Sequence, residues 1–216
     1  MAMTIAIMGE SGSGKTTSMR NLPPESTMYI DADQKGLSWR GWRTAYNTEN
    51  RNYVRTSNKD MILSLFQRID KDADFANVKT VIVDTINGIM VDDEMSRMKE
   101  KGYDKWADLA FAVYGLITYA LKMRDDLTII FLAHAQAERD DNGNMWTHIK
   151  TSGKKLDKIV LESKFTTVLY SKCIDGKHVF ETHANNSTAK TPLGAFEETT
   201  IDNDIVEVLK RLEEFR

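Results

Sequence analysis

The feature that most limits the fold is a glycine-rich segment near the N-terminus, GESGSGKT at residues 9–16, which follows a short apolar run. It fits the pattern G-x-x-x-x-G-K-[ST] in full. Glycines let a backbone wrap around phosphate groups with several N–H groups pointing inward, and a helix start adds partial positive charge. The segment therefore predicts a nucleotide-phosphate site. Its residues are Gly9, Glu10, Ser11, Gly12, Ser13, Gly14, Lys15, Thr16 and Thr17.

Three residues have expected catalytic or metal-binding roles in that site. Lys15 should reach the β- and γ-phosphates, and Thr16 should ligate magnesium. The apolar run at 80–84 (TVIVD) ends on Asp84, at the edge of a sheet where such folds bind their ligands. A carboxylate there would hold magnesium together with Thr16. We therefore expect ATP and Mg²⁺ as cofactors.

The order of apolar and amphipathic segments predicts the fold class. Continuous apolar runs suit strands buried on both faces, and strands that alternate with helices imply a mainly parallel sheet covered on both sides. The expected strands are 3–8, 28–31, 80–84 and 128–133, and the expected helices are 15–22, 58–69, 88–101 and 104–124. Together these elements predict an α/β chain with a three-layer P-loop core.

The last part of the chain has its own pattern. Two expected strands, 165–174 and 178–183, flank an Asp-Gly dipeptide that is typical of a tight hairpin turn. A segment at 156–164 looks helical, and an amphipathic helix is expected at about 203–216. Because no clear linker interrupts the chain, we expect a single domain over 1–216.

Composition excludes some classes of protein. Hydrophobic residues make up 41%, enough for a core, and the net charge of −3 gives no general support for nucleic-acid binding, so any such site must be a local patch. No apolar run has the length of a membrane span and no signal-peptide layout is present, so we expect no membrane partner and a cytoplasmic location. The single cysteine, Cys173, excludes an intramolecular disulfide and is expected to be a core thiol.

The second expected strand runs into a pair of acids. Asp33 lies just beyond it, where a carboxylate would polarise an attacking water; a solvated loop acid is the alternative. The segment 29–33 (YIDAD) resembles the one in RecA-type recombinases, where an acidic residue, usually glutamate, at the place of Asp33 activates water. The resemblance implies a catalytic Asp33, with slow turnover because the aspartate side chain is shorter.

A further candidate follows the expected strand at 128–133. In RecA-like ATPases a polar residue after this strand senses the γ-phosphate. His134 stands where that residue would be, and Gln136 is a second candidate. A histidine with a purely structural role is the alternative.

The polar stretch 138–155 is expected to be a loop with a basic second half. The matching loop of the RecA family contacts DNA, which implies a single-stranded DNA site here; a solvated loop or a lid over nucleotide is the alternative. Lysines bind phosphates and a tryptophan stacks on bases. The candidate DNA-binding residues are Arg139, Trp146, Lys150, Lys154, Lys155 and Lys158. A second basic stretch, 35–55, interleaves Trp39 and Trp42 with arginines, but core or interface packing of these tryptophans is favoured over a DNA site.

The whole pattern resembles the short phage-encoded RecA-like ATPases, often labelled phage nucleotide-binding or single-strand annealing proteins. The resemblance runs from the P-loop to the C-terminus and includes 189–198 (AKTPLGAFEE) and 201–204 (IDND). It implies an ATPase that binds single-stranded DNA and promotes annealing and homologous recombination in phage DNA metabolism, in the cytoplasm of the bacterial host. It also implies a homo-oligomer with nucleotide between subunits, and phage or host single-strand-binding or replication proteins as partners.

Two other functions fit the same P-loop. A nucleotide-dependent switch that binds a replication or recombination partner is supported by the aspartate at position 33 in place of glutamate. A small-molecule kinase is disfavoured, because the segment 138–155 has only one arginine, Arg139, where a kinase lid would carry several.

Overall fold

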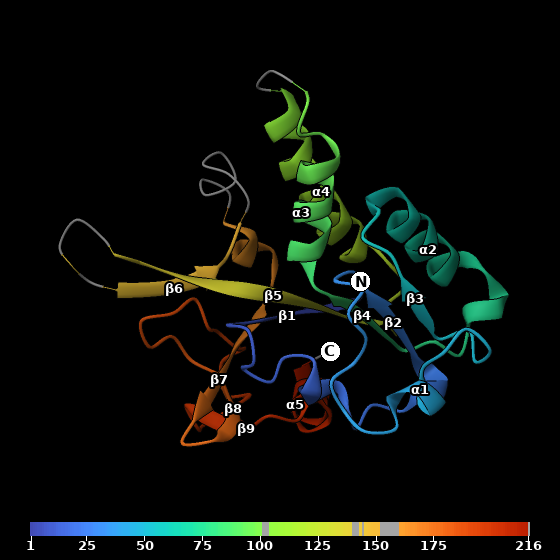
Figure 1. Ribbon diagram of the computed structural model, residues 1–216. Coiled ribbons are helices and arrows are strands. Elements are labelled where there is room, and N and C mark those ends of the chain that lie inside the picture. The colour runs from blue at the N-terminus through green and yellow to red at the C-terminus, as the bar shows by residue number, and fades with distance from the viewer. Residues whose placement is uncertain (101–103, 140–142, 144, 152–159, 216) are drawn as a thin grey trace.

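The computed structural model describes residues 1–100, 104–139, 143, 145–151 and 160–215, and for residues 104–110 it describes the backbone only. This part of the chain forms a nine-stranded sheet with helices on both faces (Figure 1). The strands are β1 (Met3–Gly9), β2 (Thr27–Asp31), β3 (Tyr53–Arg55), β4 (Thr80–Asp84), β5 (Thr128–Arg139), β6 (Met145–Ile149), β7 (Thr167–Ile174), β8 (Lys177–Glu181) and β9 (Thr200–Asp202). The helices are α1 (Trp42–Ala45), α2 (Lys59–Lys71), α3 (Ile86–Ser96), α4 (Asp104–Ala120) and α5 (Ile205–Leu212).

The strand order is β3-β2-β4-β5-β1-β7-β8-β9, and β6 pairs with the outer half of β5. The strands from β3 to β7 along this order run parallel, and β8 and β9 continue the edge in antiparallel pairing.

The predicted C-terminal hairpin is confirmed as β7–β8. Its turn residues Asp175 and Gly176 have φ angles of 50° and 78°, which is the left-handed conformation that a tight hairpin turn requires. The predicted three-layer P-loop core is therefore confirmed.

Two apolar clusters, one on each face, hold the layers together. Along β1 the side chains alternate, so Ala6 and Met8 join the cluster under α2, α3 and α4, while Ile5 and Ile7 join the cluster under α5. All four are fully buried. Burial on both faces explains why β1 reads as a continuous apolar run instead of an alternating one.

Helix α2 shows how one of the covering helices is specified. Its N-cap is Asn58, whose side chain accepts hydrogen bonds from the second and third helical N–H groups and so satisfies two free donors. The residues that bury its inner face are Ile62, Phe66 and Ile69. The helix is confirmed close to its expected bounds, and the side chain of Met61 at its start is 58% exposed.

The helix expected at 15–22 is wrong. The chain after the P-loop lysine forms turns and a 3-10 helix, η1 (Thr17–Met19), and no α-helix. The hydroxyl of Ser18 donates a 2.6 Å hydrogen bond to the carbonyl oxygen of Lys15, three residues back. Serine and threonine hydroxyls compete in this way with the backbone ladder of a helix, and two threonines and a serine follow the lysine.

The loop expected at 138–155 is wrong in part. Strand β5 does not stop near Ala133 but continues to Arg139, and β6 returns alongside it, with Gln136 opposite His148 and Glu138 opposite Trp146. The resulting β5–β6 hairpin projects beyond the body of the molecule (Figure 1). Of the helix expected at 156–164, the described part is a 3-10 helix, η5 (Leu161–Lys164).

The C-terminal segment packs on the same sheet as the P-loop strand. Helix α5 is capped by Asp204, whose side chain accepts from the N–H of Val206, and it buries Ile205, Val208 and Leu212. It ends at Leu212, before a final 3-10 helix, η6 (Glu213–Phe215), so the regular helix is shorter than expected. Among the described residues, no helix combines the length and the apolar character that crossing a membrane requires.

Cys173 is not a core thiol. It is exposed near the end of β7, where it pairs with His178 of β8. The apolar residues near Cys173 in the sequence continue along β7 beyond the core, because the β7–β8 hairpin extends beyond the layer of helices.

Candidate nucleotide and metal site

The parallel strands bring the predicted site residues to one edge of the sheet. Gly9 at the end of β1 lies beside His134 of β5, and Asp31 at the end of β2 lies beside Asp84 of β4. Asp33 follows β2 by two residues, and its N–H donates to the carbonyl oxygen of Asp84. Carboxyl ends of parallel strands are where ligands bind in open α/β sheets.

The P-loop encloses the side chain of its own lysine. The Nζ of Lys15 donates 2.8 Å hydrogen bonds to the carbonyl oxygens of Gly9 and Glu10. The φ angles of Gly12 and Gly14 are 78° and 100°, a conformation that side chains with a Cβ rarely adopt. Burial lowers the pKa of Lys15 to about 8, although the negative charge of Asp84 opposes the shift.

Residues from the C-terminal part of the chain support this loop. A Cβ on Gly14 would lie 2.8 Å from Cγ of His178 and 3.0 Å from Oδ1 of Asn203, so both residues press directly on the loop. The hydroxyl of Ser171 donates to the carbonyl oxygen of Ser13 (2.8 Å) and accepts from the amide of Asn203 (3.2 Å). Sequence reasoning missed all three supporting residues, because nothing near them in the chain marks their contact with the P-loop.

Asp84 has the features of a metal ligand. It is only 1% exposed, and its Oδ2 accepts hydrogen bonds of 2.7 Å from the hydroxyls of Thr16 and Tyr29. Its Oδ1 is buried and has no hydrogen-bond partner among the described residues. Burial raises the pKa of Asp84, and the nearby charge of Lys35 opposes that shift. An orphaned carboxylate oxygen beside a threonine hydroxyl fits magnesium, which prefers oxygen ligands.

Asp33 is held as a carboxylate. Its Oδ2 accepts a 2.6 Å hydrogen bond from Nζ of Lys35, and its Oδ1 accepts a 2.8 Å hydrogen bond from the hydroxyl of Thr85. Burial alone would raise the pKa of Asp33, but these two hydrogen bonds and the charge of Lys35 keep it below its ordinary value. An ionised carboxylate at this place has the protonation state that a general base needs.

The neighbouring acid, Asp31, has a structural role. Its Oδ2 accepts from the N–H of Gly36 (2.8 Å) and from the hydroxyl of Tyr53 (2.6 Å), so it closes the turn that carries Asp33. Of the acids at the end of β2 and just beyond it, Asp33 is the one that contacts Thr85.

His134 is connected to the β5–β6 hairpin. Its backbone N–H donates to Oδ1 of Asn87 (2.7 Å), and Nδ2 of Asn87 donates to the carbonyl oxygen of Lys150 (2.8 Å). Burial and then the nearby charge of Lys15 lower the pKa of His134, so its imidazole is neutral at neutral pH. Asn87 was missed by the sequence reasoning.

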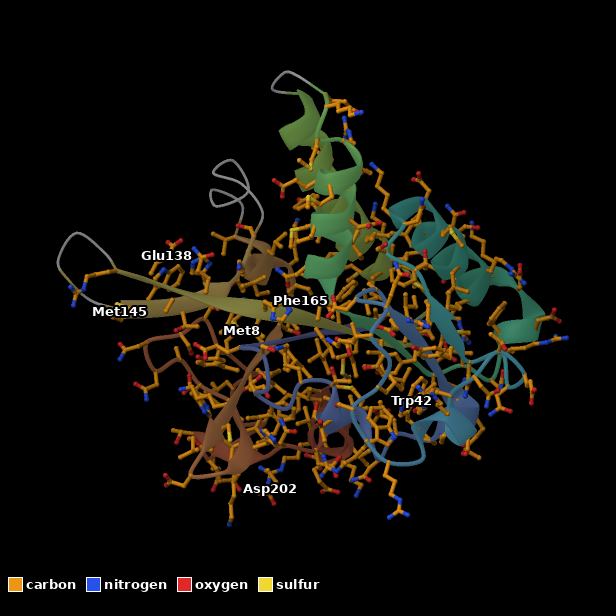
Figure 2. The ribbon with its side chains drawn as sticks, in the orientation of Figure 1. Met8, Trp42, Glu138, Met145, Phe165 and Asp202 are labelled. Atoms are coloured by element: carbon orange, nitrogen blue, oxygen red, sulfur yellow. The ribbon has the colours of Figure 1, made fainter. Side chains whose placement is uncertain are left out.

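The candidate DNA-binding residues divide into two groups. Arg139, Trp146 and Lys150 lie on or next to the β5–β6 hairpin, and Figure 2 shows Glu138 and Met145 of this hairpin far from the core. Trp146 is 42% exposed and stacks on His148, with ring centroids 5.2 Å apart. The remaining candidates, Lys154, Lys155 and Lys158, lie outside the described residues.

The tryptophans of the other basic stretch are packing residues. Trp39 and Trp42 lie against the cluster under α5, where Trp39 contacts Tyr29 edge-on and Trp42 contacts Tyr53 (ring centroids 6.3 Å and 5.3 Å apart). The favoured interpretation of these two tryptophans as packing residues is therefore confirmed.

A family model described as an AAA domain matches residues 1–193. The chain belongs to this AAA domain family. The match includes the P-loop, Asp33, Asp84 and His134, whereas Asn203, which supports the loop, lies beyond it. A comparison with curated proteins gave no match. This AAA domain is thus a nucleotide-binding protein of the P-loop ATPase type, for which magnesium is the usual metal.

Proposed function

We propose that this AAA domain hydrolyses ATP with magnesium and uses its nucleotide state to control binding of single-stranded DNA, in the annealing and recombination of phage DNA. The observation that carries the proposal is the pair of hydrogen bonds through Asn87, which joins His134 at the nucleotide site to Lys150 at the base of the hairpin. The phage context and the annealing role rest on the sequence resemblance.

The chemistry and positions of five side chains support the hydrolytic part. Lys15 would neutralise the β- and γ-phosphates, and Thr16 and Asp84 would hold magnesium, which stabilises charge on the phosphates when it is bound. Asp33 would orient and deprotonate the attacking water. His134, neutral and half-buried beside them, would sense the γ-phosphate through a hydrogen bond that its imidazole N–H donates to a phosphate oxygen.

The chemistry of the hairpin supports single-stranded DNA as the partner. Trp146 is exposed enough for a base to stack on it, and Arg139 and Lys150 are exposed at the end of β5 and just after β6. Aromatic stacking combined with cationic contacts to phosphate is the usual way in which proteins bind single strands without sequence preference. We propose that a homo-oligomer aligns several such hairpins along one strand, with nucleotide between subunits and with single-strand-binding or replication proteins as further partners.

The experiment is a single-stranded DNA titration of Trp146→Ala and Lys150→Ala, read by fluorescence anisotropy at two salt concentrations. We expect each substitution to weaken binding by roughly 1–3 kcal/mol, without loss of ATP binding. The matched control is Lys177→Ala, which lies at the start of β8 and outside the β5–β6 hairpin. Wild-type protein that binds no single-stranded DNA, or variants that bind like the control, would contradict the proposal.

Hydrolysis has its own test. Asp33→Asn should retain ATP binding and lose turnover, because the amide keeps the shape of the side chain but cannot accept the proton of water. Lys15→Ala provides the baseline, since it should lose ATP binding as well. Normal turnover by Asp33→Asn would show that another group is the base.

A second candidate function is a nucleotide-dependent switch that binds a protein partner. It is favoured by three exposed apolar side chains on α3 and in the turn that follows it, namely Val91, Met95 and Met98. The first two also line a pocket of about 380 Å³ that reaches Asp33 and His134. Turnover no greater than that of Lys15→Ala, together with no DNA binding, would favour this function over the first.

A further inference from the structure

Lys35 lies inside the nucleotide site, although its place in the sequence groups it with the basic stretch at 35–55. The turn after β2 takes the left-handed conformation at Gln34 and Gly36, with φ angles of 57° and 83°. This turn sends the side chain of Lys35 back across the ends of β2 and β4. Its Nζ lies 2.6 Å from Oδ2 of Asp33 and 3.7 Å from Oδ1 of Asp84.

One ammonium group therefore lies close to two carboxylates. The Asp84 oxygen that it approaches is the one without a hydrogen-bond partner among the described residues. A buried carboxylate without a compensating charge is costly, so Lys35 contributes to the stability of the unliganded site. Lys35 itself is 48% exposed, which leaves room for its side chain to move away.

The same oxygen is the one that a divalent cation would use. The other oxygen of Asp84 already accepts from Thr16 and Tyr29, so a metal ion held by Asp84 and the hydroxyl of Thr16 must approach Oδ1. Two positive charges near one buried oxygen repel each other. Lys35 and magnesium therefore exclude each other from Asp84.

We infer that Lys35 makes metal binding at Asp84 depend on the triphosphate. A metal ion that arrives alone must bind against the positive charge of Lys35, which Asp33 holds beside Oδ1 of Asp84. A metal ion that arrives with a triphosphate brings oxygens that neutralise the displaced ammonium, so the exchange of cations becomes favourable. Lys35 is thus a positioning residue that keeps the metal site closed to free divalent cations; the inference rests on the proposed ATP and magnesium site.

The test is a titration of nucleotide-free protein with Mn²⁺, followed by electron paramagnetic resonance at mildly alkaline pH. Lys35→Gln removes the competing charge and should bind Mn²⁺ roughly tenfold or more tightly than wild type. Lys35→Arg retains the charge and should behave like wild type. The matched control is Lys79→Gln, because Lys79 makes an ion pair of the same length, 2.6 Å, with Asp126 elsewhere on the molecule.

The outcomes separate this inference from the proposed function. Tighter Mn²⁺ binding by Lys35→Gln alone supports the inference, even if wild type hydrolyses no ATP. Equal Mn²⁺ binding by wild type and Lys35→Gln overturns it, and so does the same gain in Lys79→Gln. Lys35→Met is the second neutral variant if Lys35→Gln unfolds, which circular dichroism would detect.

Discussion

The hydroxyl of Thr16 donates a 2.7 Å hydrogen bond to Oδ2 of Asp84, although 68 positions separate the two residues. This contact ties the P-loop to the strand that carries the acidic metal ligand. It also fixes which oxygen of Asp84 remains available, because Oδ1 has no hydrogen-bond partner among the described residues. The two proposed magnesium ligands are therefore oriented by each other before any metal binds.

Removing that hydroxyl should weaken metal binding. Thr16→Val has nearly the same shape but neither donates to Asp84 nor ligates a cation, so the apparent affinity for Mg²⁺ in ATP turnover should fall roughly 10- to 100-fold. Thr16→Ser retains the hydroxyl and is the control. The measurement is turnover as a function of Mg²⁺ concentration, and equal curves for Thr16→Val and wild type would remove Thr16 from the metal site.

ATP affinity should depend on pH because of Lys15. Burial places the pKa of its ammonium group at about 8, and only the protonated form attracts phosphate. The affinity should therefore be constant below that value and should fall as the pH rises through it. Lys15→Arg stays charged over this range, so its affinity should not change with pH. Binding measured by calorimetry between neutral and alkaline pH checks this, and parallel curves for both proteins would contradict it.

Gly88 should control the position of Asp33. A Cβ at Gly88 would lie 2.6 Å from Oδ1 of Asp33 and 2.8 Å from the carbonyl oxygen of Ala32, so Gly88→Ala must push the turn after β2. We expect a loss of about 1–3 kcal/mol in the free energy of unfolding. Turnover should fall by a larger factor than ATP affinity, because misplacement of a base by a fraction of an ångström slows the reaction.

The control for that substitution is Gly115→Ala on α4, where an added Cβ meets no atom within 4 Å. This change should raise stability by about 1 kcal/mol, because alanine is the better helix former. Urea unfolding and steady-state turnover of both variants make the comparison. If Gly88→Ala turns over ATP like Gly115→Ala, the close approach of α3 does not position Asp33.

Asn87 should couple the nucleotide site to the hairpin. Asn87→Asp keeps an acceptor for the N–H of His134 but replaces the donor to the carbonyl oxygen of Lys150 with a second oxygen, which repels it. We expect single-stranded DNA to stimulate turnover in the wild-type protein. In Asn87→Asp the DNA should still bind, since the hairpin residues are unchanged, but this stimulation should be lost.

Asn77 provides the matched control for this coupling. Its side-chain amide also donates to a backbone carbonyl oxygen, that of Glu25 at 3.0 Å, in a part of the molecule remote from the hairpin. Asn77→Asp should retain DNA stimulation. Stimulation that survives in Asn87→Asp, measured at saturating DNA, would show that the two sites communicate by another route.

Much of the site could be predicted from the sequence, because its main signals are local. The P-loop pattern, the apolar strand that ends on Asp84 and the acid after β2 each occupy a few consecutive residues. The parallel sheet then brings them together, since the ends of β1, β2, β4 and β5 meet at one edge.

The missed residues act across long distances in the chain. Tyr29 fits the strand pattern as an ordinary buried aromatic residue, and only the pairing of β2 with β4 shows that its hydroxyl bonds to Asp84. Lys35 was grouped by charge with neighbouring arginines, because the turn that directs it inward depends on φ angles that the sequence does not specify. The prediction of a helix after the P-loop was wrong for the opposite reason. There a local interaction, the hydrogen bond from the hydroxyl of Ser18 to the backbone, outweighs the general pattern of a helix after a P-loop.

Strand β5 is one continuous strand that runs from the buried sheet into the β5–β6 hairpin. Its inner half is clamped between β1 and β4, and its outer half extends five residues beyond His134, roughly 16 Å at the usual rise of a strand. No loop separates the two halves, so no flexible segment between them would absorb a rotation of the inner half. A tilt of β5 too small to disturb the core would sweep the tip of the hairpin through a much larger arc, as a lever amplifies the motion of its short arm.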